Sequence, residues 1–212
     1  GGEQPRVLLN IGGMANCTYV PRRAEEAGAF AFDTGPGMAV IDAIAELLDP
    51  SLHSDLDGRL AAAGTPNDVV LGRLLADPFF AAPPPRSTGR ERFGTGYAAK
   101  LHLEAPGPDG IATAVELTAR TIADAIRCWM PEATEVVASG GGCHHPGVMG
   151  RLEAHLGTGY RLRRFADLFF TGDAKEAVAF ALLGYLTIHG QPGNLPAATG
   201  ARGRRVLGMF TP

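Results

Sequence analysis

Short apolar segments alternate with longer amphipathic ones along this chain, and no other feature restricts its fold as strongly. Residues 6–11, 17–20, 29–32 and 135–138 have the length and composition of buried strands. Most of the longer segments carry apolar residues at spacings of three and four, as a helix with one buried face does. Strands that alternate with helices predict an α/β fold in which helices flank the sheet.

Five helices are predicted from these spacings and from their end signals. The clearest covers residues 109–130, where apolar residues repeat at helical spacing and a proline follows the last turn. The other four cover residues 36–48, 66–76, 146–156 and 173–189. Residues 17–20 are expected to pair back on residues 6–11 as a hairpin, with Gly12 and Gly13 in its turn.

Composition and charge exclude several classes of function. The net charge is -3 and 19% of the residues are charged, so no basic surface for nucleic acid or an anionic membrane is expected. No apolar run approaches the ~20 residues that a membrane-spanning helix needs. The three cysteines, Cys17, Cys128 and Cys143, are odd in number and far apart, which fits a reducing compartment. We therefore expect a cytoplasmic protein.

Two glycine-rich turns have the form of phosphate-binding loops. The turn in residues 10–16 could direct backbone amides at a phosphate, or it could be a plain hairpin turn. Residues 140–142 are three consecutive glycines between a strand and a helix predicted to begin at Pro146. A helix N-terminus attracts anions, and a tight turn rarely needs three glycines for steric reasons, so a ligand is favoured there. Neither turn has Rossmann or P-loop spacing.

A third turn, Asp33-Thr34-Gly35-Pro36-Gly37, carries a carboxylate and a hydroxyl after a predicted strand. Open α/β sheets bind their ligands at the carboxyl ends of strands, so this turn is a candidate binding site. An Asp-Thr-Gly triplet also occurs in aspartic proteases. Those enzymes need paired carboxylates in a β-rich fold, and this chain has one triplet and too many helices.

Seven segments, in order over nearly the whole chain, resemble motifs of the anhydro-N-acetylmuramic acid kinase family, within the sugar kinase/actin/heat-shock ATPase superfamily. They are residues 9–16, 32–37, 84–91, 116–119, 139–142 with Pro146, 172–177, and 192–196 with Thr199 and Gly200. The resemblance implies an actin-like (ribonuclease H-like) ATPase lobe over residues 1–212, with a mixed sheet and flanking helices. It implies that this is the C-terminal lobe, which binds nucleotide and sugar.

The resemblance also implies a reaction and its ligands. The family uses ATP and Mg²⁺ to phosphorylate 1,6-anhydro-N-acetylmuramic acid while water opens the anhydro ring, in the recycling of peptidoglycan. The partners are then small molecules, and a homodimer is compatible with the family. The residues expected to bind ATP are Asn10, Gly12, Gly13, Gly140, Gly141 and Gly142. Those expected to face the sugar are Asp33, Thr34, Gly35 and Glu176, with Ser87 and Thr88 as further polar contacts.

Several of these residues have simpler interpretations. Glu176 could be an exposed helix residue, and Asp173 could cap or precede the same helix. Residues 86–91 could form a local cluster of ion pairs. The pair His144 and His145 lacks partners at zinc spacing, so no metal site is predicted there.

The chain departs from the family pattern in two kinds of place. Met38 and His145 stand where the family usually has Asn. The Gly-Thr-Ser-x-Asp-Gly loop and the Gly-Gly-Gln-Gly-Ala-Pro segment, which follows the catalytic Asp, do not occur in the sequence. We expect that the N-terminal lobe is mostly missing, that the catalytic Asp lies upstream of Gly1, and that the 212 residues alone are inactive.

Two alternatives to the complete kinase remain. The chain could be a non-catalytic module that binds nucleotide or sugar, or that needs an N-terminal partner. It could also be another kinase of the same superfold, although the turn at Asp33 and residues 84–91 argue against that.

Overall fold

A mixed five-stranded sheet forms the centre of the computed structural model, which describes residues 3–209 except for the side chain of Asp173. The strands are β1 (Arg6–Ile11), β2 (Met14–Val20), β3 (Phe30–Pro36), β4 (Glu135–Ser139) and β5 (Arg161–Arg164). Their order is β3-β2-β1-β4-β5. β2 is antiparallel to β1 and β3, whereas β4 is parallel to β1 and β5. This order confirms the α/β prediction and the mixed sheet expected of an actin-like lobe.

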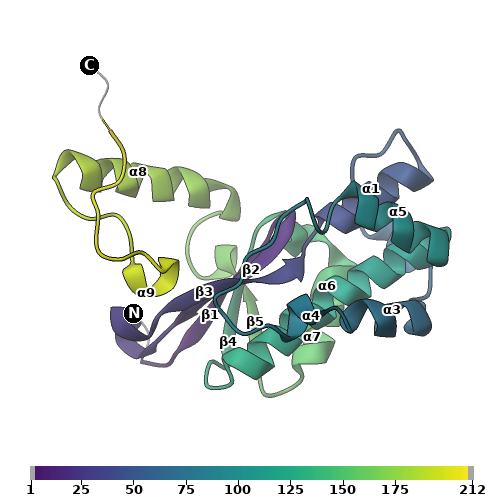
Figure 1. The fold of residues 1–212 in the computed structure, drawn as a ribbon, viewed down its shortest axis with the longest axis horizontal. Helices are drawn as coiled ribbons and strands as arrows, with labels where there is room; N and C mark the ends of the chain where they lie inside the picture. The colour runs from purple at the N-terminus through teal and green to yellow at the C-terminus, as the bar shows by residue number, and fades with distance from the viewer. Residues whose placement is uncertain (1–2, 210–212) are drawn as a thin grey trace.

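Helices cover one face of this sheet (Figure 1). They are α1 (Ala39–Leu48), α2 (Arg59–Ala62), α3 (Asp68–Leu75), α4 (Pro78–Ala81), α5 (Thr95–Glu104), α6 (Pro108–Trp129) and α7 (Pro146–Leu156). The central helix, α6, buries the apolar stripe that predicted it, and its Ile111, Ile122 and Ile126 are fully buried in the core. Two further helices, α8 (Lys175–Ile188) and α9 (Pro196–Thr199), lie on the other side of the sheet (Figure 1).

Buried and partly exposed side chains alternate along β1 and the first half of β2. In β1 the residues Val7, Leu9 and Ile11 are buried in the core, while the residues between them are partly exposed. β2 repeats the pattern with Ala15 and Cys17 buried. Because strand side chains point to opposite faces in turn, one face of β1 and β2 packs into the core, and Asn10 and Asn16 lie partly exposed on the other.

Three element predictions need correction. The predicted turn at Asp33 is instead strand, since β3 continues to Pro36 by pairing with β2 across a bulge at Ala15 and Asn16. Helix α5 was missed because its apolar residues do not follow helical spacing; it buries only Ala98 and Leu101. Strand β5 was missed because three of its four residues are arginines. Pairing with β4 is what makes it a strand.

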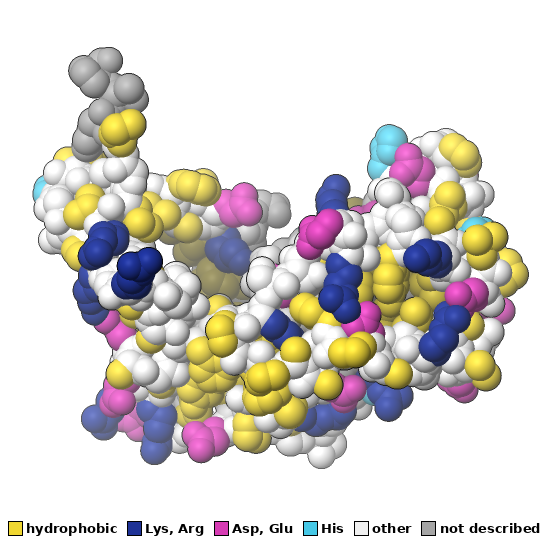
Figure 2. All heavy atoms as spheres, viewed as in Figure 1, with side chains coloured by type: hydrophobic (Ala, Val, Ile, Leu, Met, Phe, Trp, Pro, Cys, Tyr) yellow, Lys and Arg dark blue, Asp and Glu magenta, His cyan; other side chains and the backbone are white. Residues whose placement is uncertain are grey.

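Helix α8 differs from the others because it has no buried residue. Its large apolar side chains are exposed (Val178, Phe180, Leu182, Tyr185 and Ile188). Figure 2 shows a hollow between the segment that carries α8 and α9 and the rest of the molecule. Within residues 3–209, no helix has both the length and the apolar character that crossing a membrane requires.

Candidate functional site

Four polar side chains form a row across the accessible face of the sheet. Asp33 of β3 lies opposite Asn16 of β2, which lies opposite Asn10 of β1, and Asn10 is in register with Ser139 of β4. Side chains in register on neighbouring strands share a face and lie close together. The strands thus bring one carboxylate, two carboxamides and a hydroxyl to one line near the carboxyl ends of β1 and β4.

Lys175, the first residue of α8, completes this row. Its Nζ donates hydrogen bonds to Asn10 Oδ1 (2.9 Å) and to Ser139 Oγ (2.7 Å). The Ser139 hydroxyl in turn donates to the backbone oxygen of Leu9 (3.1 Å). Partial burial lowers the pKa of Lys175 from its usual value. The sequence had given Lys175 no role beyond its place in the family-like segment 172–177.

The hairpin turn at Gly12 and Gly13 holds the start of α1. The amide of Gly12 donates to Met14 O (3.1 Å), and its carbonyl accepts from the Met38 amide (2.8 Å). The carbonyl of Gly13 accepts from the amides on either side of Met38. A Cβ on Gly37 would lie 2.2 Å from Gly12 O, so that glycine is needed for close packing. Met38 contributes its amide to this turn, and its side chain is buried in the hydrophobic core, where a methionine packs in place of the usual Asn.

The three consecutive glycines have different physical reasons. A Cβ on Gly140 would lie 2.6 Å from Ile11 O, and Gly140 also has a φ of +90°. A Cβ on Gly142 would lie 2.3 Å from Ile11 Cγ2. A Cβ on Gly141 would meet nothing within 4 Å. Packing against Ile11 therefore explains two of the three glycines. The sequence had instead favoured a ligand as the reason for all three. Of the three, Gly141 alone faces open space.

His145 caps the helix that follows this turn. Its Nδ1 accepts a hydrogen bond from the amide of Val148 (3.1 Å), the bond that a carboxamide oxygen makes at such a position. The ring is fully buried, with Nε2 3.6 Å from Asp55 Oδ2. Burial lowers the pKa of His145, and the Asp55 carboxylate opposes that shift. The histidine thus takes the structural role of the usual Asn as a helix cap.

Asp33 is bound to the segment that follows the three prolines. Its Oδ2 accepts from the Ser87 hydroxyl (3.0 Å) and from the Thr88 amide (2.8 Å). Its backbone oxygen accepts from Arg86 Nε (2.9 Å). Asp33, Arg86 and Ser87 line an open cavity of about 420 Å³ together with Asn16 and Thr199. The structure therefore brings together Asp33, Ser87 and Thr88, which the sequence had linked only as neighbours of one ligand.

Residues 86–91 do not form the ion-pair cluster considered above. In the described residues neither arginine of this segment, nor Glu91, takes part in an ion pair. Arg86 instead donates to the carbonyls of Phe80 (2.8 Å) and Ala82 (2.5 Å) and stacks on the ring of Phe32. That interpretation was wrong, because carbonyls and aromatic faces can satisfy a partly buried guanidinium without a carboxylate.

Three further residues predicted to face the sugar have other surroundings. The Thr34 hydroxyl is buried and donates to Ala15 O (3.1 Å). Gly35 has a φ of +146°, and a Cβ there would lie 2.7 Å from the Phe80 ring. Glu176 is exposed on α8, and the structure shows no ion pair for it between residues 3 and 209. These residues stay predictions, and the side chain of Asp173 lies outside the described part.

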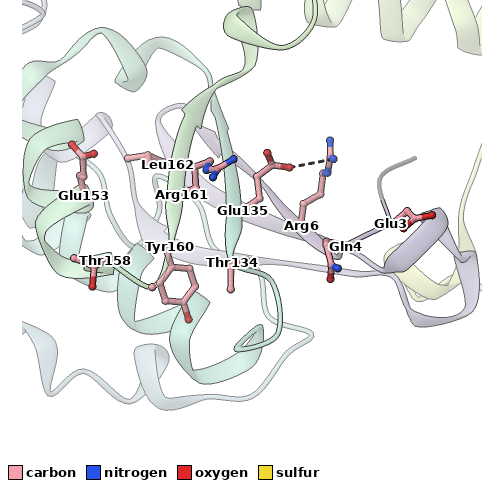
Figure 3. A pocket seen from close by; sticks show the side chains of 11 residues that line it. Glu3, Gln4, Arg6, Thr134, Glu135, Glu153, Thr158, Tyr160, Arg161 and Leu162 are labelled. Carbon is pink, nitrogen blue, oxygen red and sulfur yellow. Dashed lines mark ion pairs between the residues drawn. The ribbon is translucent and has the colours of Figure 1, made fainter.

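No group of three metal-ligating side chains occurs among the described residues, including those around His144 and His145. A larger cavity, of about 660 Å³, is lined by residues such as Arg6, Tyr160 and Arg161, with Arg6 paired to Glu135 (Figure 3). It lies at the amino ends of β1, β4 and β5. Since α/β sheets bind ligands at the opposite edge, volume alone does not make it the functional site.

A profile described as "Anhydro-N-acetylmuramic acid kinase" matches residues 2–212. The chain belongs to this family. It is 47% identical over 210 residues to the anhydro-N-acetylmuramic acid kinase of Streptomyces avermitilis, covering 97% of this chain and 52% of that protein. The protein of the same name from Rhodococcus erythropolis is 44% identical over 220 residues, covering 100% of this chain and 55% of the relative.

The chain spans about half the length of the curated family members that it matches. Among solved structures, an activator of 2-hydroxyisocaproyl-CoA dehydratase from Clostridium difficile with bound ADPNP is similar. Its TM-score is 0.44 at 15% identity, covering 75% of this chain and 53% of that chain, which is too low to carry a conclusion. The family membership confirms the resemblance found in the sequence.

Proposed function

We propose that residues 1–212 are the C-terminal lobe of an ATP-dependent kinase for 1,6-anhydro-N-acetylmuramic acid. The product is N-acetylmuramic acid 6-phosphate, formed as water opens the anhydro ring, and the setting is peptidoglycan recycling in the cytoplasm. The observation that supports this most is the polar row at the carboxyl ends of the strands. A row of neutral polar groups with one lysine and one carboxylate suits a ligand that has both phosphates and hydroxyls.

The two ends of the row suit different parts of the ligands. At the β1–β4 end, Asn10, Lys175 and the open backbone at Gly141 offer donors to phosphate oxygens. At the β3 end, the Asp33 carboxylate can accept from a sugar hydroxyl while Ser87 and Thr88 fix its position. Phosphoryl transfer depends mainly on positioning and charge stabilisation, which such fixed groups provide. Gly12 and Gly13 lie beside the nucleotide end, and Glu176 lies next to Lys175 in sequence.

Mg²⁺ fits this arrangement as a companion of the nucleotide. It usually keeps several waters and takes one or two carboxylates together with phosphates. The described residues hold no cluster of three metal ligands, so the ion would be held mainly by the phosphates of ATP and by water. When bound, the ion neutralises charge on the transferring phosphoryl group.

We further propose that these 212 residues bind ligands without turning them over. The absent motifs include the loop that grips phosphate and the segment next to the catalytic Asp of the family. The competing candidate, a non-catalytic remnant that binds nucleotide or sugar, predicts the same behaviour in isolation. The two differ when the N-terminal lobe of a family member is added, because only the kinase lobe then releases ADP.

Calorimetric titration tests the proposal most directly. ATP with Mg²⁺ and anhydro-N-acetylmuramic acid are titrated separately into the purified chain, and both are expected to bind. Asp33→Asn should weaken the binding of the sugar and leave the affinity for ATP unchanged. An absence of binding by both ligands would contradict the assignment, and steady ADP release by the chain alone would contradict the prediction of inactivity.

A further inference from the structure

We infer that the ammonium group of Lys175 binds the phosphate chain of the nucleotide directly. The inference rests on the proposed function. It supplies a positive charge for the phosphates, which the glycine turns, with backbone amides alone, do not provide. Lys175 comes from α8, far from both turns in the sequence, and the fold places it over the carboxyl ends of β1 and β4.

Neutral groups hold the ammonium group of Lys175. Its two acceptors, Asn10 Oδ1 and Ser139 Oγ, are both neutral. Among the described side chains, which do not include that of Asp173, it has no carboxylate partner within ion-pair distance. Cys143 and Glu176 are the titratable groups near it. Burial keeps the Cys143 thiol neutral by raising its pKa to about 11.

The geometry leaves one of the three ammonium hydrogens for a ligand. An ammonium group has three donors, and two of them are used by Asn10 and Ser139. The neighbouring turn has an open side at Gly141, so a phosphate can approach without meeting a Cβ. A partly buried ammonium ion gains more from an anion than an exposed one, because water screens the pair less.

A simpler role for Lys175 is to tie α8 to the sheet. Helix α8 buries none of its own residues, so this side chain is an anchor in either case. An anchor alone would not respond to phosphate, whereas a ligand contact would. The pKa of Lys175 separates the two, since an adjacent anion favours the charged form and raises the pKa.

The sequence allows this measurement to be specific, because Lys100 and Lys175 are the two lysines of the chain. Protein labelled with ¹³C at the lysine ε-carbon therefore gives two signals that can be titrated with pH. Saturation with tripolyphosphate should raise the pKa of Lys175. Lys100 is exposed on α5 and should not move. An unchanged pKa of Lys175 at saturation would overturn the inference.

Matched variants give the second readout. Lys175→Met should weaken the binding of tripolyphosphate and of ATP by about tenfold or more, as expected for the loss of one hydrogen bond to a charged group. Lys100→Met should bind like the unmodified chain, and thermal melting checks that both variants fold. If Lys175→Met binds ATP as tightly as the unmodified chain, this inference fails and the kinase assignment stands. If tripolyphosphate binds through Lys175 and ATP binds no more tightly than tripolyphosphate, Lys175 is a phosphate contact but the site is not specific for a nucleotide.

Discussion

On one face of the sheet the side chains of β1, β2 and β4 pack on α6, and on the other they form the polar row. Leu9 and Ile11 are buried on the first face, while Asn10, between them in sequence, hydrogen bonds to Lys175 on the second. The two faces therefore differ in chemistry although the same strands supply both. Substitutions at adjacent residues should therefore change either the free energy of unfolding or ligand binding, depending on the face. The glycine turns show a similar division, with Gly142 packed and Gly141 open.

The strongest test of this contrast is at neighbouring positions in β1. Leu9→Ala should lower the free energy of unfolding by about 2–5 kcal/mol, because it leaves a cavity in the core. Leu8→Ala, on the other face and only partly buried, should cost clearly less. Urea denaturation of both variants measures the difference. Equal losses would mean that the two faces are equally well packed.

A second test compares two of the three glycines. Gly142→Ala should cost about 1–3 kcal/mol, since the new methyl group would overlap the Ile11 side chain. Gly141→Ala has free space and should change the free energy of unfolding by less than about 0.5 kcal/mol. If Gly141 faces the nucleotide, its variant should instead weaken ATP in calorimetry. Unchanged ATP affinity would remove Gly141 from the site.

A third test concerns the buried cap at His145. His145→Ala should cost about 1 kcal/mol by losing the cap, whereas His145→Asn keeps an acceptor. The folded pKa lies below the usual 6.5, so the unfolded chain binds an extra proton as the pH falls below that value. The unmodified chain should therefore lose stability relative to His145→Asn between about pH 6.5 and 5, and not above pH 7. Thermal melting at several pH values checks this, and parallel curves would contradict it.

The smallest expected change in stability is on the polar face. Asp33→Asn keeps an acceptor for Ser87 and Thr88, so the free energy of unfolding should fall by less than about 1 kcal/mol. Sugar binding should nevertheless be lost if the carboxylate meets a hydroxyl. Glu176→Gln is the companion variant, because Glu176 is exposed and its loss should not alter folding. A large drop in stability for Asp33→Asn would show that the residue belongs to the packing and not to the site.

Much of the fold could be read from periodicity, and the failures have physical causes. Strand β1 and helix α7 have the predicted bounds, because their patterns are strong and prolines or glycines mark their ends. Helix α5 and strand β5 lack such patterns and form through contacts with α1 and β4. Of the proposed site, the sequence indicated the glycine turns and Asp33. It gave no reason to place Lys175 beside Asn10, 165 positions away.

The amino-acid sequence by itself determined the α/β class and the family, because local periodicity and ordered motifs do not depend on how distant segments meet. It did not determine which motif residues serve packing and which remain open to a ligand. Only the tertiary structure showed that Gly140 and Gly142 are needed by Ile11, that His145 is a cap, and that Lys175 reaches the sheet. These roles depend on neighbours far along the chain, and a steric or hydrogen-bonded contact between such neighbours exists only once the strands have paired.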